Sequence, residues 1–312
     1  MLTVCICTHD RPAYLRDCLD GLRQQTIGPD GFDILVVDSA STADVPAQLV
    51  RLVAAVTNAR LVQVGQLGVS IARNTGAAAA SGDYIAYIDD DAIPAPDWVA
   101  CILAAIERGN PKPAMIGGRI LPQWEAPLPD WWPPRLRGVL SIIEAEGQGE
   151  YRSAALPAGL EPYGANMVVQ IRALHAVGGF GRTSGRSGQA LLSDEEVQLA
   201  HKLQPAGHSV RYDSRIVVRH QIQATRLTPA WLLSRLYWQG VSAVLTRRTL
   251  GSPVAVWREL PRRLAVALLL APMALVPCGS TRLVPCRWRL AYALGFIHGA
   301  LGWRTGMAKA AG

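Results

Sequence analysis

The chain has 312 residues, of which 50% are hydrophobic and 18% are charged. This length suits one large domain of roughly 200 to 250 residues with an additional segment, or two ordinary domains. The composition excludes a small disulfide-stapled fold and long disordered stretches, because half of the residues can be buried in a core.

Charge is divided unevenly along the chain. Residues 1–201 carry 15 basic and 22 acidic side chains, whereas residues 202–312 carry 16 basic and 2 acidic ones, a net charge of +14 for this last third. A basic segment of this kind predicts an anionic partner, either a phospholipid surface or a nucleic acid.

Cysteine usage and the first residues bear on the cellular compartment. The six cysteines, at positions 5, 7, 18, 101, 278 and 286, include no Cys-x-x-Cys pair, which argues against a zinc finger or a disulfide scaffold. The apolar run 2–7 has no basic flank and is shorter than a signal-peptide core of about 7 to 15 residues. We therefore expect no signal peptide and a chain that stays in the reducing cytosol.

The first 120 residues alternate β-branched runs with helical patterns, which is typical of βα units on a mostly parallel sheet. Helices are predicted from Pro12, around 49–56, over 70–80 and around 99–109, where apolar residues recur at helical spacing. Strands are predicted at 3–7, 32–37, 60–64 and 84–88. The fold class is therefore α/β, with a nucleotide-binding type of sheet in the N-terminal part.

The pattern changes after residue 120. Residues 121–162 form a proline- and tryptophan-rich segment that is too long for an idle connection, and we interpret it as a substrate-facing loop region. Regular structure is predicted again at 164–170, followed by a glycine-rich segment at 178–188, a helix over 194–203 and a strand near 215–219. The remainder is predicted to be helical.

Nucleotide motifs of two kinds are absent from the sequence. No Gly-x-Gly-x-x-Gly follows the first strand, and no Gly-x-x-x-x-Gly-Lys-Ser/Thr occurs, which removes the main support for a dinucleotide dehydrogenase or a P-loop enzyme. The strand 84–88 runs instead into Asp89, Asp90 and Asp91, at a carboxyl end where open α/β sheets bind ligands. Adjacent carboxylates repel unless they share a cation, so either a hard-metal site or a solvated acidic turn fits.

Asp38 ends the second predicted strand, again at a carboxyl end. There a carboxylate can accept hydrogen bonds from a base or a ribose, but for the residue taken alone an Asx turn or a helix cap is the favoured explanation.

Four motifs in a fixed order carry a resemblance to a known family. They are Thr-His-Asp-Arg-Pro at 8–12, Val-Val-Asp-Ser at 36–39, Gly-Val-Ser-Ile-Ala-Arg-Asn-Thr-Gly at 68–76 and the aspartates at 89–91. Together they resemble the family-2 glycosyltransferases of the GT-A fold over roughly residues 1–245. The resemblance implies a GT-A type mostly parallel sheet flanked by helices, and an inverting transfer of a hexose from a nucleoside-diphosphate sugar, a UDP-sugar in particular, to a hydroxyl of a lipid-linked or polysaccharide acceptor.

The resemblance also implies roles at the nucleotide. Asp38 would receive the base, Asp89 would reach the ribose, and Arg73 would lie near the diphosphate or brace the aspartates. Asp91 and His220 would hold a divalent metal, Mn²⁺ or Mg²⁺, which the developing charge of a leaving diphosphate requires. The nucleotide site would comprise Thr8, Arg11, Asp38, Arg73, Asp89 and Asp90.

An inverting transfer needs a general base for the acceptor hydroxyl. The family's acidic pair best matches Glu195-Glu196, and we assign the base to Glu196, with Glu195 remaining open. Ser193 and Glu196 also have the spacing of a helix capping box, which would engage the glutamate with the backbone. The site for the acceptor and the donor sugar would comprise Gly164, Ala165, Asn166 and Asp194.

The basic third contains two uncharged apolar segments, 264–281 with 18 residues and 290–303 with 14, and both have arginines at their edges. A clean transmembrane span needs about 20 apolar residues, so in-plane or re-entrant helices on an anionic leaflet are favoured. Buried helices that pack on the catalytic domain are the alternative. Nucleic acid is the poorer partner, because the arginines border apolar helices and no nucleic-acid module occurs.

The sequence thus predicts a GT-A domain over 1–245, with a nucleotide-binding half at 1–120 and an acceptor half at 121–245, and a basic helical extension over 246–312. The expected location is the cytoplasmic face of the cell membrane, with peripheral or monotopic attachment. A nucleotidyltransferase on a similar sheet and a catalytically silent membrane scaffold are the rival functions.

Overall fold

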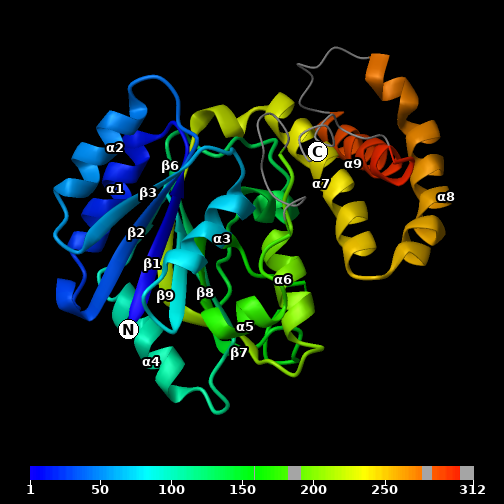
Figure 1. The fold of residues 1–312 in the computed structure, drawn as a ribbon. Helices are drawn as coiled ribbons and strands as arrows, with labels where there is room; N and C mark the ends of the chain where they lie inside the picture. Colours follow the sequence, from blue (N-terminus) through cyan, green and yellow to red (C-terminus); the bar gives the residue numbers. More distant parts are fainter. Residues whose placement is uncertain (158, 182–190, 276–282, 303–312) are drawn as a thin grey trace.

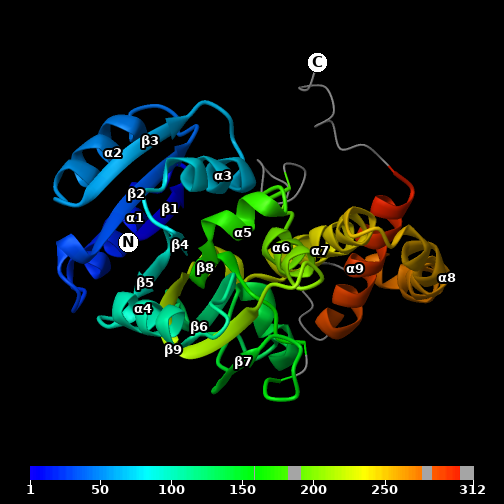
Figure 2. The ribbon, with the colours of Figure 1, turned by 60° about the horizontal axis from the view of Figure 1, so that its bottom comes forward.

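A computed structural model describes residues 1–157, 159–181, 191–275 and 283–302. Within these residues, one nine-stranded sheet flanked by helices forms the body of the molecule. A group of three long helices, α7 to α9, stands beside this body (Figures 1 and 2). The predicted α/β fold class is confirmed.

The first four strands are parallel to one another and lie in the order β3-β2-β1-β4. The chain moves outward from β1 to β3 and then returns to the other side of β1, so α1 and α2 cover one face and α3 covers the opposite face (Figure 1). The strands are β1 (Leu2–Thr8), β2 (Phe32–Ser39), β3 (Ala59–Val64) and β4 (Tyr84–Asp89), and the helices are α1 (Pro12–Arg23), α2 (Val45–Ala54) and α3 (Val69–Ala79).

These elements follow the patterns in the sequence. The predicted helix from Pro12 is present as α1, with Pro12 in its first turn and Leu15, Cys18, Leu19 and Leu22 buried against the sheet. The strands β1, β2 and β4 are buried on both faces, as their continuous apolar runs predict.

The second half of the sheet is mixed rather than parallel. The strand β8 pairs antiparallel with both β4 and β6, and β9 pairs parallel with β6 but antiparallel with β5 and β7. These strands are β5 (Ala92–Pro94), β6 (Met115–Trp124), β7 (Gln148–Glu150), β8 (Met167–Gln170) and β9 (Val210–Ile222), and the helices among them are α4 (Trp98–Arg108), α5 (Ile171–Ala176) and α6 (Glu195–Leu203). Short 3₁₀ turns lie at Pro29–Gly31, Pro134–Leu140, Gly164–Asn166, Ala224–Leu227 and Ala271–Leu275.

The tryptophan-rich segment 121–162, which we expected to face the substrate, packs largely against the C-terminal helices. Trp132 is 3% exposed and belongs to a second hydrophobic cluster, which it forms with side chains of the C-terminal helices such as Leu232 and Leu236. Of the described residues in this segment, Ser141 alone lines the main pocket. The tryptophans serve to attach the C-terminal helices to the sheet, because their large apolar area is buried in that contact.

The C-terminal helices are α7 (Pro229–Thr249), α8 (Pro253–Leu270) and α9 (Val284–Ala300). The predicted domain boundary at 245/246 falls inside α7, so α7 belongs both to the catalytic body and to the extension. Phe296 is fully buried in α9, which makes this part of the apolar segment 290–303 a packed core helix. In the described part of the chain, no helix is long and apolar enough to cross a bilayer. Residues 276–282 and 303–312 of the extension lie outside the described residues.

Glycines hold α7 and α9 close together. A Cβ atom on Gly295 would lie 1.8 Å from the backbone oxygen of Tyr237, and one on Gly240 would lie 2.3 Å from the backbone oxygen of Tyr292. Since both obstacles are backbone atoms, no side-chain rotation can relieve them.

We expect Gly295→Ala to lower the free energy of unfolding by about 1–3 kcal/mol, because the added methyl group forces α7 and α9 apart. Urea denaturation followed by circular dichroism measures this change. Gly28→Ala is the matched control, since a Cβ there meets no atom within 4 Å. Equal stability of the two variants would contradict the close packing of α7 on α9.

Candidate active site

The principal pocket lies at the carboxyl ends of β1 and β4, where the strand order reverses. Open α/β sheets bind ligands at this switch point, because the helices on either side of it cover opposite faces and leave a crevice. The pocket has a volume of about 340 Å³. Its lining includes residues from both halves of the sheet, among them Thr8, Arg11, Arg73, Asp89, Asp90, Asp91, Gly164, Glu195, Glu196 and His220.

The register of the strands aligns three of the predicted nucleotide residues. Thr8 is paired with Asp38 across β1 and β2, and Cys7 is paired with Asp89 across β1 and β4. Thr8 and Asp89 line the pocket, but Asp38 is 2% exposed and is not among the lining residues. Its carboxylate accepts a hydrogen bond from the Ser41 N–H at 3.1 Å, which is the Asx-type turn that the sequence left open.

Asp90 is buried at the base of the pocket. Its carboxylate accepts hydrogen bonds from the Thr8 hydroxyl at 2.8 Å and from Arg11 at 3.1 Å. Burial raises the pKa of Asp90 to about 7, against the opposing effect of Arg11, and the charge of Asp91 adds to the rise. Asp90 therefore orients Thr8 and Arg11 in the wall of the pocket, which all three residues line.

Asp91 lies beside His220, as the predicted pairing requires. Because Ala92 and His220 are opposite each other in β5 and β9, the imidazole Nε2 comes within 3.2 Å of Asp91 Oδ1. Asp91 Oδ2 accepts hydrogen bonds from three side chains, Arg11, Gln223 and Arg226. Burial favours a raised pKa for Asp91, but His220 and the two arginines outweigh burial and hold its pKa well below the usual range.

Arg73 is the central cation of the site. It is 3% exposed and lies near the carboxylates of Glu195 at 2.9 Å, Glu196 at 3.1 Å and Asp89 at 3.5 Å. Its guanidinium also lies over the ring of Phe180, with 5.7 Å between the guanidinium carbon and the ring centroid. Burial alone would lower the pKa of Arg73, but the three carboxylates have a larger, opposite effect. The pKa of Arg73 is therefore raised above its usual value, and the side chain stays charged.

The motif around Arg73 explains its placement. A Cβ on Gly76 would lie 2.4 Å from Cys5 Sγ, so the glycine lets α3 approach β1 closely. Asn74 exchanges two hydrogen bonds of 2.9 Å with the backbone of Phe180, which fixes the aromatic ring next to the guanidinium.

Glu195 and Glu196 begin α6, but the predicted capping box does not form. The side chain of Ser193 bonds to Asp194, and Glu196 Oε1 accepts a hydrogen bond from the Gly164 N–H at 2.8 Å instead of reaching back to the helix start. Asp194 adopts a left-handed backbone conformation with φ of 78°, which turns the two glutamates toward Arg73. The acidic pair therefore belongs to the pocket rather than to a helix cap.

Gly164 is a close-contact position between the two halves of the site. A Cβ there would lie 1.8 Å from Arg73 Nη2 and 2.5 Å from Glu196 Oε1. Ala165 also lines the pocket, whereas Asn166 lies behind it and is not among the lining residues. The Asn166 amide binds Trp98 Nε1 and the carbonyls of Arg119 and Ile216, so it joins β6 to β9.

Sequence reasoning missed Arg226, Gln223 and Arg235. Arg226 and Gln223 contact Asp91, and Arg235 of α7 lines the pocket next to Asp194. The signal that could have found Arg226 is its position shortly after His220, in a polar segment that leaves the sheet at the same edge. Nothing in the sequence distinguished Arg235, because a single arginine in a largely apolar helix is expected at the surface.

The sequence comparison now decides the family of this domain. Residues 3–134 match the family described as Glycosyl transferase family 2. These residues are a glycosyl transferase family 2 domain. They include Thr8, Asp38, Arg73 and the three aspartates, so the suspected resemblance is confirmed for the part of the chain that carries its motifs.

Relatives of this family 2 domain include glycosyltransferases with assigned functions. The chain is 30% identical over 176 residues to a glucosyl-dolichyl phosphate glucuronosyltransferase of Haloferax volcanii, covering 56% of this chain and 54% of that protein. It is 27% identical over 237 residues to a pre-mycofactocin glycosyltransferase of Mycobacterium tuberculosis, covering 75% and 46%. The chain thus spans about half the length of these curated relatives.

Solved structures share the fold of the family 2 domain and extend the likeness to the whole chain. A mannosyltransferase from Pyrobaculum calidifontis, solved with GDP-Man and Mn²⁺, superposes with a TM-score of 0.61 at 18% identity, covering 97% of this chain and 88% of that one. The TarS protein of S. aureus, solved with UDP, gives a TM-score of 0.53 at 13% identity, covering 97% and 93%. The fold of this chain is that of the GT-A glycosyltransferases.

Asp91 and His220 fit a divalent ion that takes its remaining ligands from a substrate. Among the described residues, no three His, Cys, Asp or Glu side chains converge on one point as a closed metal site would require. Asp91 and His220 do meet, and the His220 Nδ1 is directed at the Leu140 carbonyl at 3.0 Å, which leaves Nε2 facing Asp91. Mg²⁺-type sites commonly use one or two carboxylates together with phosphate oxygens of a substrate, so the single carboxylate of Asp91 does not argue against such an ion.

Glu195 provides a pH test of the buried charge cluster. Burial raises its pKa from 4.5 to about 7, with Glu196 adding to the rise and Arg73 opposing it. A carboxyl group with a raised pKa stabilises the folded state below its unfolded pKa, and this stabilisation is lost as the pH rises through the folded pKa. Glu195→Gln, which cannot ionise, should therefore gain stability relative to the wild type as the pH rises from about 5 to about 8.

Urea denaturation of both proteins across this pH range measures the difference in the free energy of unfolding. The exposed Glu107 of α4 supplies the control variant, Glu107→Gln. A difference between Glu195→Gln and the wild type that does not change with pH would contradict the burial of Glu195 as an ionisable group.

Proposed function

We propose that this protein is an inverting, metal-dependent glycosyltransferase that moves a hexose from a nucleoside-diphosphate sugar to an acceptor hydroxyl. The observation that carries this proposal is the meeting of Asp89, Arg73 and the Glu195–Glu196 pair in one pocket. Asp89 comes from the nucleotide-binding half and the glutamates from the acceptor half, and Arg73 lies against all three. Glycosyl transfer requires residues that bind the donor and a base that deprotonates the acceptor, and the two must lie within one cavity.

The donor would bind along the carboxyl ends of β1, β2 and β4. Thr8 and Asp38 are neighbours there. We assign the base to the strand end at Asp38, whose buried carboxylate supports the turn at Ser41, and the ribose to Asp89, whose side chain is 38% exposed. Arg11 and Asp90 would contribute to the nucleotide site, where Asp90 holds the side chains of Thr8 and Arg11 in place. Structural neighbours were solved with GDP-Man, UDP and UDP-GlcNAc, and we propose a UDP-sugar for this chain.

Asp91 and His220 would hold the divalent ion, Mn²⁺ or Mg²⁺. Six carboxyl groups and four arginines appear among the described lining residues, and a divalent cation would balance the carboxylates that are ionised and not paired with an arginine. When bound, such an ion neutralises the charge that develops on the leaving diphosphate. Arg226 and Arg11 hold the Asp91 carboxylate in place and ionised.

We assign the general base to Glu196. Its Oε1 is fixed by the Gly164 N–H and by Arg73, while Oε2 of the neighbouring Glu195 is buried and has no hydrogen-bond partner among the residues that the structure describes. In the proposed step, Glu196 takes the proton of the acceptor hydroxyl as its oxygen attacks the anomeric carbon, and the bond from that carbon to the diphosphate oxygen breaks. Attack opposite the leaving group inverts the anomeric centre. Gly164, Ala165 and Asp194 would border the sugar and the acceptor, with Asn166 supporting them from behind.

The acceptor would be lipid-linked or a growing polysaccharide, at the cytoplasmic face of the membrane. One relative is named for glucuronosyl transfer to glucosyl-dolichyl phosphate, which supports a lipid-linked acceptor for this chain.

Product analysis distinguishes this function from its rivals. With sugar nucleotides and Mn²⁺, the proposal predicts release of free nucleoside diphosphate. Release of pyrophosphate from a nucleoside triphosphate would instead identify a nucleotidyltransferase, and the absence of metal-dependent binding in isothermal titration would leave a silent scaffold.

Glu196→Gln should lower transfer by about 10²-fold or more while donor affinity persists, because glutamine keeps the shape of the side chain but cannot take a proton. Initial rates of nucleoside diphosphate release measure transfer, and isothermal titration measures donor affinity. An active Glu196→Gln protein together with an inactive Glu195→Gln protein would assign the base to Glu195 instead.

Asp91→Asn should weaken the dependence on Mn²⁺ and lower turnover by orders of magnitude, since the amide replaces a carboxylate ligand. The readout is nucleoside diphosphate release as a function of Mn²⁺ concentration. Asp30→Asn, a surface change at the opposite end of the sheet, is the control. An unchanged Mn²⁺ requirement in Asp91→Asn would show that Asp91 is not a ligand.

A further inference from the structure

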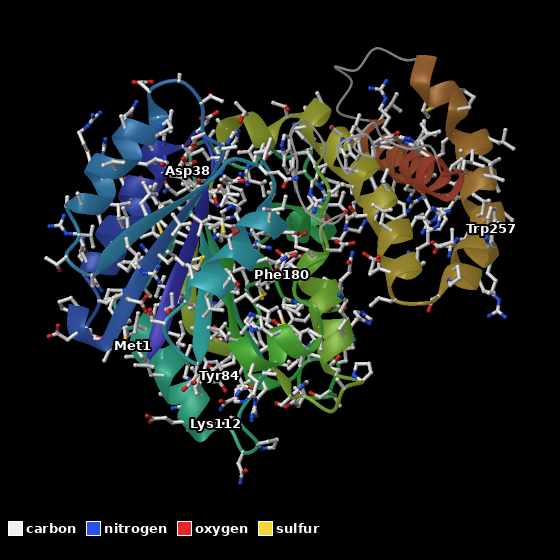
Figure 3. The ribbon with its side chains drawn as sticks, in the orientation of Figure 1. Met1, Asp38, Tyr84, Lys112, Phe180 and Trp257 are labelled. Carbon is white, nitrogen blue, oxygen red and sulfur yellow. The ribbon has the colours of Figure 1, made fainter. Side chains whose placement is uncertain are left out.

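The outer side of α8 exposes large apolar side chains that no described part of the chain covers. Trp257 is 56% exposed, Leu268 76% and Leu269 78%, and Val254 and Leu264 are also exposed. Figures 1 and 2 place α8 farthest from the sheet, and Figure 3 shows Trp257 on its outward side. Soluble proteins rarely expose so many large apolar residues on one element, so this surface indicates a binding partner.

These side chains form one continuous face. Positions 254, 257, 261, 264 and 268 follow one another at steps of three or four residues, and positions 265 and 269 continue the stripe beside 264 and 268, which places all of them on the same side of a helix. The opposite side of α8 is occupied: Val256 is 1% exposed and packs with Val244 and Phe296, and the Arg263 guanidinium lies 4.6 Å from the centroid of the Tyr292 ring. The exposed face is therefore not needed to hold α8 in the fold.

The charge of this face is purely basic. Arg258 and Arg262 are exposed within or beside the apolar stripe. The acidic residue of α8, Glu259, turns inward and bonds to Arg247 at 2.8 Å and to Arg263. An apolar face with cations and no carboxylate complements a surface that is apolar inside and anionic at its edge.

We propose that the outer face of α8 docks on an anionic phospholipid bilayer, with Trp257, Leu268 and Leu269 entering the boundary between headgroups and acyl chains. Arg258 and Arg262 would contact the lipid phosphates. The helix would lie in the plane of the membrane, because its 18 residues span only about 27 Å along the axis. This surface is independent of the pocket, so the proposal does not depend on glycosyl transfer.

A second copy of the chain fits this face less well. A two-fold dimer through α8 would bring Arg258 and Arg262 of one copy against the same arginines of the other, since they lie near the middle of the stripe. Like charges at a shared interface oppose association, whereas lipid phosphates neutralise them.

Flotation of the full chain with vesicles tests the proposal. Vesicles of phosphatidylcholine alone are compared with vesicles that also contain phosphatidylglycerol, and the wild type should bind the anionic ones more tightly. The triple variant Trp257→Ser/Leu268→Ser/Leu269→Ser should lower the partition coefficient on anionic vesicles by about 100-fold or more. Arg258→Glu/Arg262→Glu should lower it by about tenfold or more and remove the preference for anionic lipid.

The matched control is Val50→Ser/Arg51→Glu, which changes an exposed apolar residue and an exposed arginine of α2. This variant should bind vesicles like the wild type. Thermal unfolding of each variant establishes that it is folded, which the exposure of the changed residues leads us to expect.

Quenching by brominated lipid reports the orientation. The wild type contains nine tryptophans, so the quenched fraction is compared with that of Trp257→Phe, and the difference belongs to Trp257. The proposal predicts that quenching by brominated lipid is largely lost in Trp257→Phe. Vesicle binding by the triple variant equal to that of the wild type would overturn the proposal. The proposal would also be overturned if the wild type formed a dimer in sedimentation and did not bind vesicles, and if the triple variant were monomeric.

Discussion

The site depends on one buried cation, the guanidinium of Arg73. A buried charge is tolerated only where opposite charges and hydrogen bonds surround it, and Arg73 has three carboxylates and the ring of Phe180 for neighbours. Two of those carboxylates come from α6, more than a hundred residues later in the chain. Without the cation, Glu195 and Glu196 would repel each other next to Asp89, so the position of α6 against the first half of the sheet depends on it.

The remaining charges of the pocket form a second group around Asp91. Arg11, Arg226 and His220 converge on this carboxylate from α1, from the turn after β9 and from β9 itself. The two groups meet at Asp89, which is bound to Arg73 but is still exposed to the pocket. In the proposed mechanism, the group around Asp91 would face the donor's diphosphate and the group around Arg73 would face the attacking hydroxyl.

Much of this arrangement could be predicted from the sequence. The parallel strands and their helices followed from continuous apolar runs and helical spacing, and the order of four motifs brought Thr8, Arg73, Asp89 and Asp91 to one edge. The contact of His220 with Asp91 was implied by the family resemblance. Other features depended on tertiary contacts that no local pattern encodes. Ser193 and Glu196 have capping-box spacing, yet the left-handed Asp194 turns the glutamate to Gly164. The segments that form parts of α8 and α9 are both uncharged and apolar in the sequence. In the structure, glycines let α9 pack on α7, whereas α8 keeps one face exposed. The proline- and tryptophan-rich segment 121–162 suggested a substrate-facing loop, because the packing of its tryptophans with α7 cannot be seen in the local sequence.

The central claim is that a single carboxylate base activates the attacking hydroxyl on the side of the sugar opposite the diphosphate. Proton NMR of the anomeric centre during slow hydrolysis of a sugar nucleotide tests this claim without knowledge of the acceptor, since water takes the place of the acceptor hydroxyl. Starting from an α-linked donor, the account predicts that the first sugar released is the β anomer, before mutarotation mixes the two forms. First release of the α anomer would contradict the account, because retention requires an attack from the same face or a covalent intermediate that this arrangement does not provide.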